Sequence, residues 1–516
     1  MKLDNLTKEV TSIYEHLVEI ESTARQMSRT VHPNHQSSVL NLIRYLVLRN
    51  YDLRQIHDTL SEYGISSLRS AEAYTLKNVV DVLKLVHLLQ QQDWSPDPDL
   101  VLIGYEKSRK LRHLHANELF NEIDQLCFTE IMVTMPSEAA EDRDLVRRLI
   151  KAGMEIGRIN LSHDNEEVWK KIAENIRKCS KELDIPCKIA MDLGGPKIRI
   201  ENILVRQKQK VRSTDRILVK DEMEISFVAT GNIEIKGKCK EKKKFELVGL
   251  QLSLPEIFED VKTGERVFFD DGKVRGRIID RSSDKITVRI EAGAEKGAFL
   301  KVEKGVNLPD SDLKLASLTE EDMAILPFAM DHADIISYSF IRKPKDVEML
   351  YEILGERLDK VGILLKIETQ EACQNLPLIL IEGMKSPKLG VMIARGDLAV
   401  EIGPERMSEI QDEIMWICEA AHVPVVWATE VLDRLAKKGR PTRSEITDAA
   451  ASVRAECVML NKGPHIVEAV SLLKRILIKM EMHTSKKKSK MRPLNIAMDA
   501  LKYIDSKRFE QVYPEY

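Results

Sequence analysis

The chain has 516 residues, of which 43% are hydrophobic and 31% are charged. This length is too great for one ordinary domain, and the hydrophobic content excludes a largely disordered chain. Its 79 basic and 82 acidic side chains leave a formal charge of −3, so the overall charge favours neither a nucleic-acid partner nor a membrane partner. Seven scattered cysteines without a Cys-x-x-Cys pair argue against a disulfide framework and a zinc cluster.

The N-terminal sequence MKLDNLTKEV is too polar for a secretory signal. No apolar run approaches the roughly 20 residues that a membrane-spanning helix needs. We therefore expect a cytoplasmic protein without a membrane segment.

Residues 1–125 are predicted to form a helical domain. Apolar residues at helical spacing lie over 40–48, 52–63 and 70–91, and a Ser-Pro-Asp-Pro-Asp segment at 95–99 is typical of a linker. A helix–glycine–helix segment near 56–76 could be a helix-turn-helix, but no basic face accompanies it. We favour a packing or assembly module whose wide apolar faces need a partner surface, and we expect a homo-oligomer.

From residue 130 onward, short apolar segments alternate with amphipathic ones. The predicted strands are 131–135, 157–162, 188–193, 334–340, 362–368, 389–395, 424–429 and 457–462. The predicted helices are 142–153, 166–183, 319–332, 344–354, 369–381, 406–422, 444–453 and 466–482. This α/β alternation favours a (β/α)8 TIM-type barrel over an open doubly wound sheet.

One long interval, 201–306, breaks the alternation after the third strand. Residues 231–236, 266–269 and 285–290 read as strands, and Asp271-Gly272 is a hairpin signal, so we predict a small inserted β domain. The basic runs at 238–244 and 486–490 are expected to be solvated. The predicted division is a helical domain at 1–125, a barrel at 126–200 and 307–483, an insert at 201–306 and a tail at 484–516.

Polar side chains follow the carboxyl ends of several predicted strands. They are Arg158, Asn160, Ser162 and His163 after the second strand, Asp192, Lys197 and Arg199 after the third, Lys366 and Glu368 on the fifth, Asp397 after the sixth and Thr429 after the seventh. Strand ends of a barrel meet at one rim, so these groups should lie together. Arg158, Arg199 and Lys366 would neutralise a phosphoryl group. Glu368 and Asp397 are oxygen ligands suited to one Mg2+.

The sequence contains neither a Gly-x-x-x-x-Gly-Lys-[Ser/Thr] loop nor a Gly-x-Gly-x-x-Gly turn, so phosphates would be bound in another way. A purely structural ion-pair network at the barrel mouth is the alternative interpretation. We favour it less because buried cations rarely accumulate without a ligand.

Seven segments together resemble the pyruvate kinase family and occur in that family's order. They are RINLSH (158–163), MDLGGPKIR (191–199), DDG (270–272), KGVNLP (304–309), KIE (366–368), MIARGDLAVEI (392–402) and PTRSEITD (441–448). The resemblance covers about 130–470. It implies that the insert is a small β-barrel lid, and that the chain transfers a phosphoryl group from phosphoenolpyruvate to ADP with Mg2+, giving pyruvate and ATP in glycolysis.

The resemblance also assigns roles to matching positions. It implies that Arg158 and Lys366 hold the transferring phosphoryl group with help from Arg199. It implies that Glu368 and Asp397 ligate Mg2+ or Mn2+.

At the sixth and seventh strands, the resemblance implies a site for the substrate carboxylate. The backbone of Gly396 and Asp397, which opens a helix, would receive the carboxylate, and Thr429 would take part in protonating the enolate carbon. The implied nucleotide contacts are Pro136, Asn160, His163, Asp271 and Lys304.

The resemblance further implies a monovalent-cation site formed by Asn160, Ser162 and Asp192. Many family members have a Glu where this chain has Lys197, and that Glu accompanies a bound K+. The tethered ammonium of Lys197 could fill the site, so we expect K+ not to be required. The alternative is that Lys197 turns outward into solvent.

The chain departs from the family pattern in four places. Leu193, Gly194 and Lys197 stand where Thr, Lys and Glu are common, and the loop at 461–464 is short. The N-terminal helical region is extra, and we expect the family's C-terminal regulatory domain to be missing. Two other functions stay open: a phosphoenolpyruvate/pyruvate-barrel lyase such as a 2-oxo acid aldolase, and a catalytically silent regulatory protein. The lid, Arg158, Asn160 and Lys304 favour a nucleotide and count against the lyase.

Overall fold

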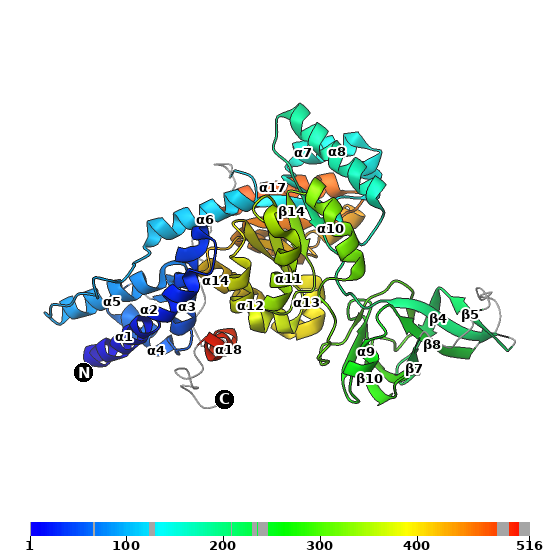
Figure 1. The fold of residues 1–516 in the computed structure, drawn as a ribbon, viewed down its shortest axis with the longest axis horizontal. Coiled ribbons are helices and arrows are strands. Elements are labelled where there is room, and N and C mark those ends of the chain that lie inside the picture. The colour runs from blue at the N-terminus through cyan, green and yellow to red at the C-terminus, as the bar shows by residue number, and fades with distance from the viewer. Residues whose placement is uncertain are drawn as a thin grey trace.

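The computed structural model describes residues 2–65, 68–122, 129–207, 209–229, 235, 246–481 and 495–504. Eight strands form its centre: β1 (Glu130–Thr134), β2 (Ile156–Asn160), β3 (Lys188–Asp192), β14 (Ile335–Tyr338), β15 (Gly362–Ile367), β16 (Leu389–Ala394), β17 (Val425–Ala428) and β18 (Cys457–Leu460). They pair in parallel and close into a barrel in the order β1-β18-β17-β16-β15-β14-β3-β2 (Figure 1). The predicted barrel is confirmed.

Helices follow the strands in sequence. They are α7 (Arg143–Ala152), α8 (Glu166–Leu183), α10 (Glu320–His332), α11 (Pro344–Leu354), α12 (Gln370–Gly383), α13 (Arg395–Ile402), α14 (Met407–Ala420), α15 (Asp433–Lys438), α16 (Arg443–Ala451) and α17 (Ile466–Glu481). All eight predicted helices are present, with ends within about two residues of those expected. Two helices were not among the predicted ranges. For α13, the resemblance implied only that a helix opens at Gly396 and Asp397. The six-residue α15 is too short to show a periodic pattern.

Local side chains explain where several of these helices begin and end. Asn165 accepts a hydrogen bond from the backbone N–H of Val168 at the start of α8, and Asp184 in the left-handed conformation ends it. Thr319 and Asp322 form a reciprocal capping box at the start of α10. These caps fix the helices that pack around the barrel.

The N-terminal region is helical, as predicted. Its helices are α1 (Lys2–Glu19), α2 (Glu21–Ser28), α3 (Gln36–Leu48), α4 (Arg54–Glu62), α5 (Thr75–Leu89) and α6 (Tyr105–Leu119). Every residue of α3 from Ser38 to Leu48 is buried, since α1, α2 and α5 pack on one part of its surface and the barrel helix α14 packs on another. The N-terminal helices lie on one side of the barrel and the inserted sheets on the other (Figure 1).

The end of α6 closes the bottom of the barrel. Leu119 and Phe120 are buried in one cluster with inward-facing barrel residues such as Met132. A Cβ atom would lie 2.6 Å from a Leu119 methyl carbon at Gly362 and 2.3 Å from one at Gly390. The lack of a side chain at these two glycines therefore leaves the space that Leu119 fills. Residues outside the barrel strands therefore complete the barrel's interior.

A buried polar interface also joins the N-terminal helices to the barrel. His422, in the turn before β17, contacts Ser38 Oγ at 3.0 Å through Nδ1 and the Ala73 carbonyl at 2.8 Å through Nε2. Asn41 Nδ2 donates to the Ala420 carbonyl at 2.8 Å. Burial lowers the pKa of His422 to about 3, so the ring is neutral in this interface.

The insert after β3 consists of ten strands: β4 (Ile200–Gln207), β5 (Lys210–Thr214), β6 (Arg216–Val219), β7 (Glu224–Val228), β8 (Glu246–Leu252), β9 (Arg266–Phe269), β10 (Val274–Arg281), β11 (Lys285–Ala292), β12 (Ala298–Lys301) and β13 (Val306–Asn307). Eight of them pair in the order β13-β9-β10-β11-β7-β8-β4-β5, and β12 pairs with β6. A small β-barrel was expected here. Its strands form two separate hydrogen-bonded sheets that share one apolar core. Apart from Ile235, the strand expected at 231–236 lies outside the described residues, as do both basic runs.

A last helix, α18 (Asn495–Ile504), packs against α12 and α3. Five cysteines are buried free thiols, and Cys127 and Cys239 lie outside the described residues. Among the helices that the structure describes, none combines the length and the apolar character that crossing a bilayer requires.

Candidate active site

A buried ion network lies at the carboxyl ends of β2, β3 and β15. Arg158 Nη2 and Nε donate to Asp192 Oδ2 at 2.7 Å and 2.9 Å, and Arg158 Nη1 donates to Thr134 Oγ1 at 2.8 Å. Burial raises the pKa of Asp192, but the charges of Arg158 and Lys366 outweigh it and hold that pKa below its usual range. The closed barrel therefore brings the predicted Arg158, Asp192 and Lys366 together, although β14 lies between β3 and β15.

Lys366 is the central cation of this network. Its Nζ lies 2.7 Å from Ser339 Oγ, 3.0 Å from Glu368 Oε1 and 3.4 Å from Asp192 Oδ2. Burial alone would lower the pKa of Lys366, but the two carboxylates raise it above its ordinary value. The ammonium is therefore kept charged inside the barrel mouth.

Glu368 directly follows β15, and Asp397 lies in the first turn of α13, which follows the neighbouring strand β16. Glu368 is buried, and its Oε2 accepts a hydrogen bond from the backbone N–H of Phe340 at 2.7 Å. Burial and the negative charge of Asp397 raise the pKa of Glu368, against the opposing effect of Lys366. Two carboxylates that repel each other in this way are a donor set that suits a hard divalent cation.

Within the described part of the chain, no group of three or more His, Cys, Asp or Glu side chains could hold a metal ion. A divalent cation at Glu368 and Asp397 would therefore complete its coordination with water or substrate oxygens. Mg2+ commonly binds in this way, through one or two carboxylates.

Lys197 points into the site and does not turn outward. Its Nζ lies 2.6 Å from Asp397 Oδ1, although the two residues are far apart in the chain. The ammonium thus rests on a predicted metal ligand, not on Asn160, Ser162 or Asp192, the side chains that the resemblance implies for a monovalent cation. Asn160 Oδ1 instead accepts a hydrogen bond from the Ser162 backbone N–H at 3.1 Å.

Thr429 and Gly396 are in direct contact, since the Gly396 N–H donates to Thr429 Oγ1 at 2.7 Å. Thr429 has a left-handed backbone (φ 64°), which is uncommon for a β-branched residue. Arg395 supports this turn by donating to the carbonyls of Ala428 and Thr429 at 3.0 Å and 2.6 Å, and it pairs with Asp448 at 2.5 Å. Neither Arg395 nor Asp448 was predicted as a supporting residue, although both lie in motifs that resemble the family.

The rim beside β1 and β2 carries the expected nucleotide contacts Pro136, Asn160 and His163. Burial and the cations Lys462 and Arg199 lower the pKa of His163. Lys462 follows β18, which pairs with β1, so this exposed lysine joins the same rim. Lys462 lies in the loop at 461–464. The sequence analysis noted that this loop is short but predicted no functional residue in it.

The lid contributes Lys304 and the turn at Asp270, Asp271 and Gly272. Lys304 Nζ lies 2.8 Å from Asp270 Oδ1. Lys304, a predicted nucleotide contact, therefore pairs with the residue that precedes Asp271, the other nucleotide contact predicted in the lid. Arg199 Nη1 donates to the Glu303 carbonyl at 3.1 Å, which places Arg199 at the base of the lid. Arg199 is therefore separate from the ion network around Lys366.

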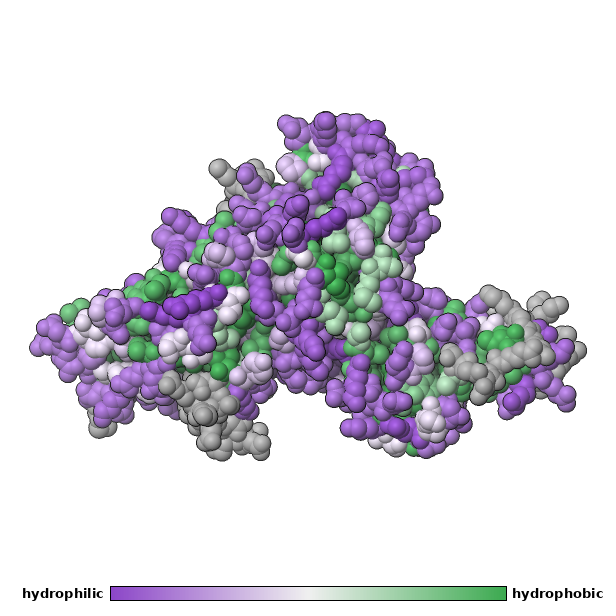
Figure 2. All heavy atoms as spheres, viewed as in Figure 1, coloured by the Kyte–Doolittle hydropathy of each residue, from purple (hydrophilic) through white to green (hydrophobic). Residues whose placement is uncertain are grey.

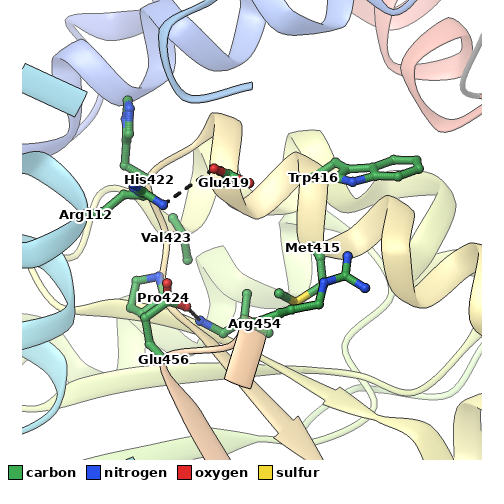
Figure 3. Close-up of a pocket in the computed structure, with 10 residues that line it drawn as sticks. Arg112, Met415, Trp416, Glu419, His422, Val423, Pro424, Arg454 and Glu456 are labelled. Atoms are coloured by element: carbon green, nitrogen blue, oxygen red, sulfur yellow. Dashed lines mark hydrogen bonds and ion pairs between the residues drawn. The ribbon is translucent and has the colours of Figure 1, made fainter. Parts of the chain in front are cut away.

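A different pocket lies at the opposite end of the barrel, where α6 meets α14 and the segments before β17 and β18 (Figure 3). Its charges are paired: Arg112 Nη1 lies 3.5 Å from Glu419 Oε1, and Arg454 Nη1 lies 2.7 Å from Asp412 Oδ1. None of the predicted site residues line it.

Comparisons with known proteins extend these observations. A family model described as the pyruvate kinase barrel domain matches residues 127–466. Pyruvate kinases from Staphylococcus aureus strains MRSA252, USA300 and NCTC 8325 / PS 47 are each 31% identical to the chain over 369 residues. The alignment covers 70% of this chain and 58% of each relative, so the chain spans little more than half the length of these proteins. The six N-terminal helices and α18 lie outside the matched range.

Proposed function

The chain belongs to the pyruvate kinase family, and from that premise we propose that it transfers the phosphoryl group of phosphoenolpyruvate to ADP, giving pyruvate and ATP in glycolysis. The observation that carries this proposal is the buried cation network at the barrel mouth. Lys366 and Arg158 both contact Asp192 Oδ2, so one carboxylate fixes two cations side by side. Fixed cations of this kind stabilise negative charge that develops during phosphoryl transfer.

In this proposal, Arg158 and Lys366 bind the transferring phosphoryl group, and Arg199 assists from the base of the lid. An incoming phosphate would replace part of the contact that each cation now makes with a carboxylate. The cations need no reorganisation, because Asp192, Thr134 and Ser339 already fix their positions.

Glu368 and Asp397 are the proposed ligands of Mg2+ or Mn2+. When bound, the divalent cation would supply positive charge beside the phosphoryl and carboxylate oxygens of the substrate. Asp397 would have to release the ammonium of Lys197 to bind it. Phe340 would keep Glu368 oriented through its backbone N–H.

The substrate carboxylate is proposed to bind at the start of α13, where helix N–H groups favour an anion. Binding there would release the Gly396 N–H from Thr429 Oγ1. The freed hydroxyl of Thr429 would then be available to take part in protonating the enolate carbon. Arg395 would hold the backbone of Thr429 in place during this step.

The nucleotide is proposed to bind between the β1–β2 rim and the lid, through Pro136, Asn160, His163, Asp271 and Lys304. The exposed positive charge of Lys462 on the same rim supports a polyanionic ligand there. The lid segments that carry Asp271 and Lys304 are joined through the ion pair of Lys304 with Asp270.

We propose that K+ is not required. The ammonium of Lys197 lies beside Asp397, and its positive charge would repel a free monovalent cation near Asn160, Ser162 and Asp192.

We also propose that the chain forms a homo-oligomer through its N-terminal helices and acts in the cytoplasm. Three leucines of α5 are strongly exposed: Leu85 at 46%, Leu88 at 69% and Leu89 at 52%. Figure 2 shows hydrophobic residues reaching the surface among these helices. The buried free thiols agree with a reducing compartment. A lower mass in solution for Leu88→Asp than for the parent protein would support assembly through this surface.

The test of the enzymatic proposal is an assay of pyruvate release from phosphoenolpyruvate, ADP and Mg2+. We expect activity that depends on all three, and a Glu368→Gln variant that needs more Mg2+. Condensation of pyruvate with an aldehyde would instead indicate a lyase. Release of pyruvate without ADP would indicate transfer of the phosphoryl group to water and would count against a kinase. Binding of phosphoenolpyruvate without turnover would indicate a silent regulatory protein.

A further inference from the structure

Two chain segments connect the lid to the barrel, and they form one ribbon. The first runs from Pro196 to Ile200, and the second from Lys304 to Asn307. The Val306 N–H donates to the Ile198 carbonyl and the Ile200 N–H donates to the Lys304 carbonyl, both at 2.9 Å. Because they are hydrogen-bonded to each other, the two connections should move together.

Each connection places one side chain on α13. From the first, Lys197 Nζ contacts Asp397 Oδ1 at 2.6 Å, in the first turn of the helix. From the second, Asn307 Nδ2 donates to Glu401 Oε1 at 3.1 Å, in the last turn. Residues four apart lie on one face of a helix, so the ribbon contacts both ends of the same face.

The lid turn provides a third contact with α13. A Cβ atom at Gly272 would lie 3.5 Å from Val400 Cγ2, so this turn approaches the helix closely. The same turn is tied to the second connection, because the Asp270 N–H donates to the Gly305 carbonyl at 3.0 Å and Asn307 pairs with Phe268. The lid turn, the second connection and α13 thus form one contacting unit.

We propose that Asn307 and Glu401 are positioning residues that couple the lid to α13 and thereby set the position of Asp397 for a divalent cation. The inference rests on the proposed function, which makes Asp397 a metal ligand. Asn307 is buried, so its amide has little access to water when the contact breaks. The Asn307–Glu401 contact lies at the end of α13 opposite Asp397, where it can orient the helix without touching the metal.

The main test exchanges donor and acceptor across this contact. Burial raises the pKa of Glu401 to about 7, so the test is run at pH 8.5, where this carboxyl group is ionised in the parent protein. There Asn307→Asp would place two carboxylates together, and their repulsion should push the second connection away from α13. Adding Glu401→Gln should restore the contact with reversed polarity, because the new amide can donate to the new carboxylate. Binding of Mn2+ alone, measured by electron paramagnetic resonance without substrates, gives a readout independent of turnover.

We expect Asn307→Asp to weaken Mn2+ binding about tenfold, as outer-shell changes at metal sites commonly do. The double variant should recover most of that loss. Glu224→Gln is the matched control, because Glu224 is a lid carboxylate paired with Arg289 at 2.9 Å, within the lid sheet and away from α13. Thermal unfolding of each variant shows whether weaker Mn2+ binding comes from a displaced α13 in a folded protein or from unfolding.

Normal Mn2+ binding by Asn307→Asp, or a double variant as weak as the single one, would overturn the proposal. Pyruvate release by the parent protein is assayed separately. A parent protein that binds Mn2+ but releases no pyruvate would overturn the enzymatic proposal. The coupling of the lid to α13 would still be supported if Asn307→Asp weakens Mn2+ binding and the double variant restores it.

Discussion

The two ends of the barrel have opposite chemistry. At the carboxyl end, Arg158, Asp192, Lys366 and Glu368 form a buried ion network. At the amino end, Leu119 and Phe120 fill the interior together with the apolar barrel residues. One sheet therefore presents buried charge at one end and a packed hydrocarbon core at the other.

This difference separates the source of activity from the source of stability. Burying charges costs free energy even when they are paired, so a network such as that around Lys366 is weak evidence for stability. Burying Leu119 and its neighbours stabilises the fold directly. In a TIM barrel, residues at the carboxyl ends of the strands carry the chemistry, whereas the opposite face supports the fold.

The largest effect is expected from Lys366→Met at the charged end. Loss of the central ammonium should lower turnover by several orders of magnitude, because one preorganised charged group is worth at least about a hundredfold and this one contacts two carboxylates. Steady-state kinetics of pyruvate release would measure it. Lys385→Met, at an exposed lysine of the surface, is the control. Near-normal turnover in a folded Lys366→Met variant would refute the role.

The next largest effect is expected from Phe120→Ala at the packed end. Removing this buried ring should lower the free energy of unfolding by about 3–5 kcal/mol. Activity per folded molecule should stay close to that of the parent protein, since Phe120 lies far from the charged rim. Urea unfolding followed by circular dichroism would measure the loss, with the exposed Leu114→Ala as control. A Phe120→Ala variant that kept full stability and lost activity would contradict the separation of the two ends.

Much of the barrel could be predicted from the sequence because its signals are local. Each strand, such as Leu389–Ala394, is a short continuous apolar run, and the caps of α8 and α10 lie within a few residues of the helix ends. Parallel strand ends meet at one rim, so the grouping of Arg158 with Lys366 also followed from the topology.

The contacts that could not be predicted join distant parts of the chain. Nothing local in α6 indicates that Leu119 fills the barrel, because the space is made by Gly362 and Gly390 far along the chain. Likewise, the approach of Lys197 to Asp397 depends on the path of the lid connections. The roles of individual residues in binding the nucleotide, the substrate carboxylate and the metal ion stay predictions.

A third effect is expected from Lys197→Glu, which changes the charge at the rim without changing the packed end. The new carboxylate would lie near Asp397, and their repulsion should create a need for a monovalent cation. We expect K+ to activate this variant roughly tenfold, within the range usual for coupled binding sites. The parent protein should be fully active in buffers that contain only tetramethylammonium. Strong activation of the parent protein by K+ would contradict the hypothesis that K+ is not required.

The smallest effect is expected at a carboxylate of the packed end. Glu130 accepts hydrogen bonds from the backbone N–H and the side-chain amide of Asn121 at 2.9 Å and 3.1 Å. Burial, and secondarily the charge of Glu155, raise the pKa of Glu130 to about 7, against the opposing effects of Asn121 and Lys188. Above its pKa, Glu130 therefore adds a buried negative charge beside Glu155 and Lys188 at the amino end of the barrel.

The sign of the pH dependence follows from that raised pKa. A carboxyl group whose pKa is higher in the folded chain than in the unfolded chain contributes stability at low pH, and this contribution is lost as the pH rises through about 7. Relative to Glu130→Gln, which does not titrate, the parent protein should lose about 2 kcal/mol of unfolding free energy between pH 5.5 and pH 8. Urea unfolding at both pH values would measure it, with the exposed Glu138→Gln as control. A stability difference between the parent protein and Glu130→Gln that stayed constant over this interval would show that Glu130 does not titrate there.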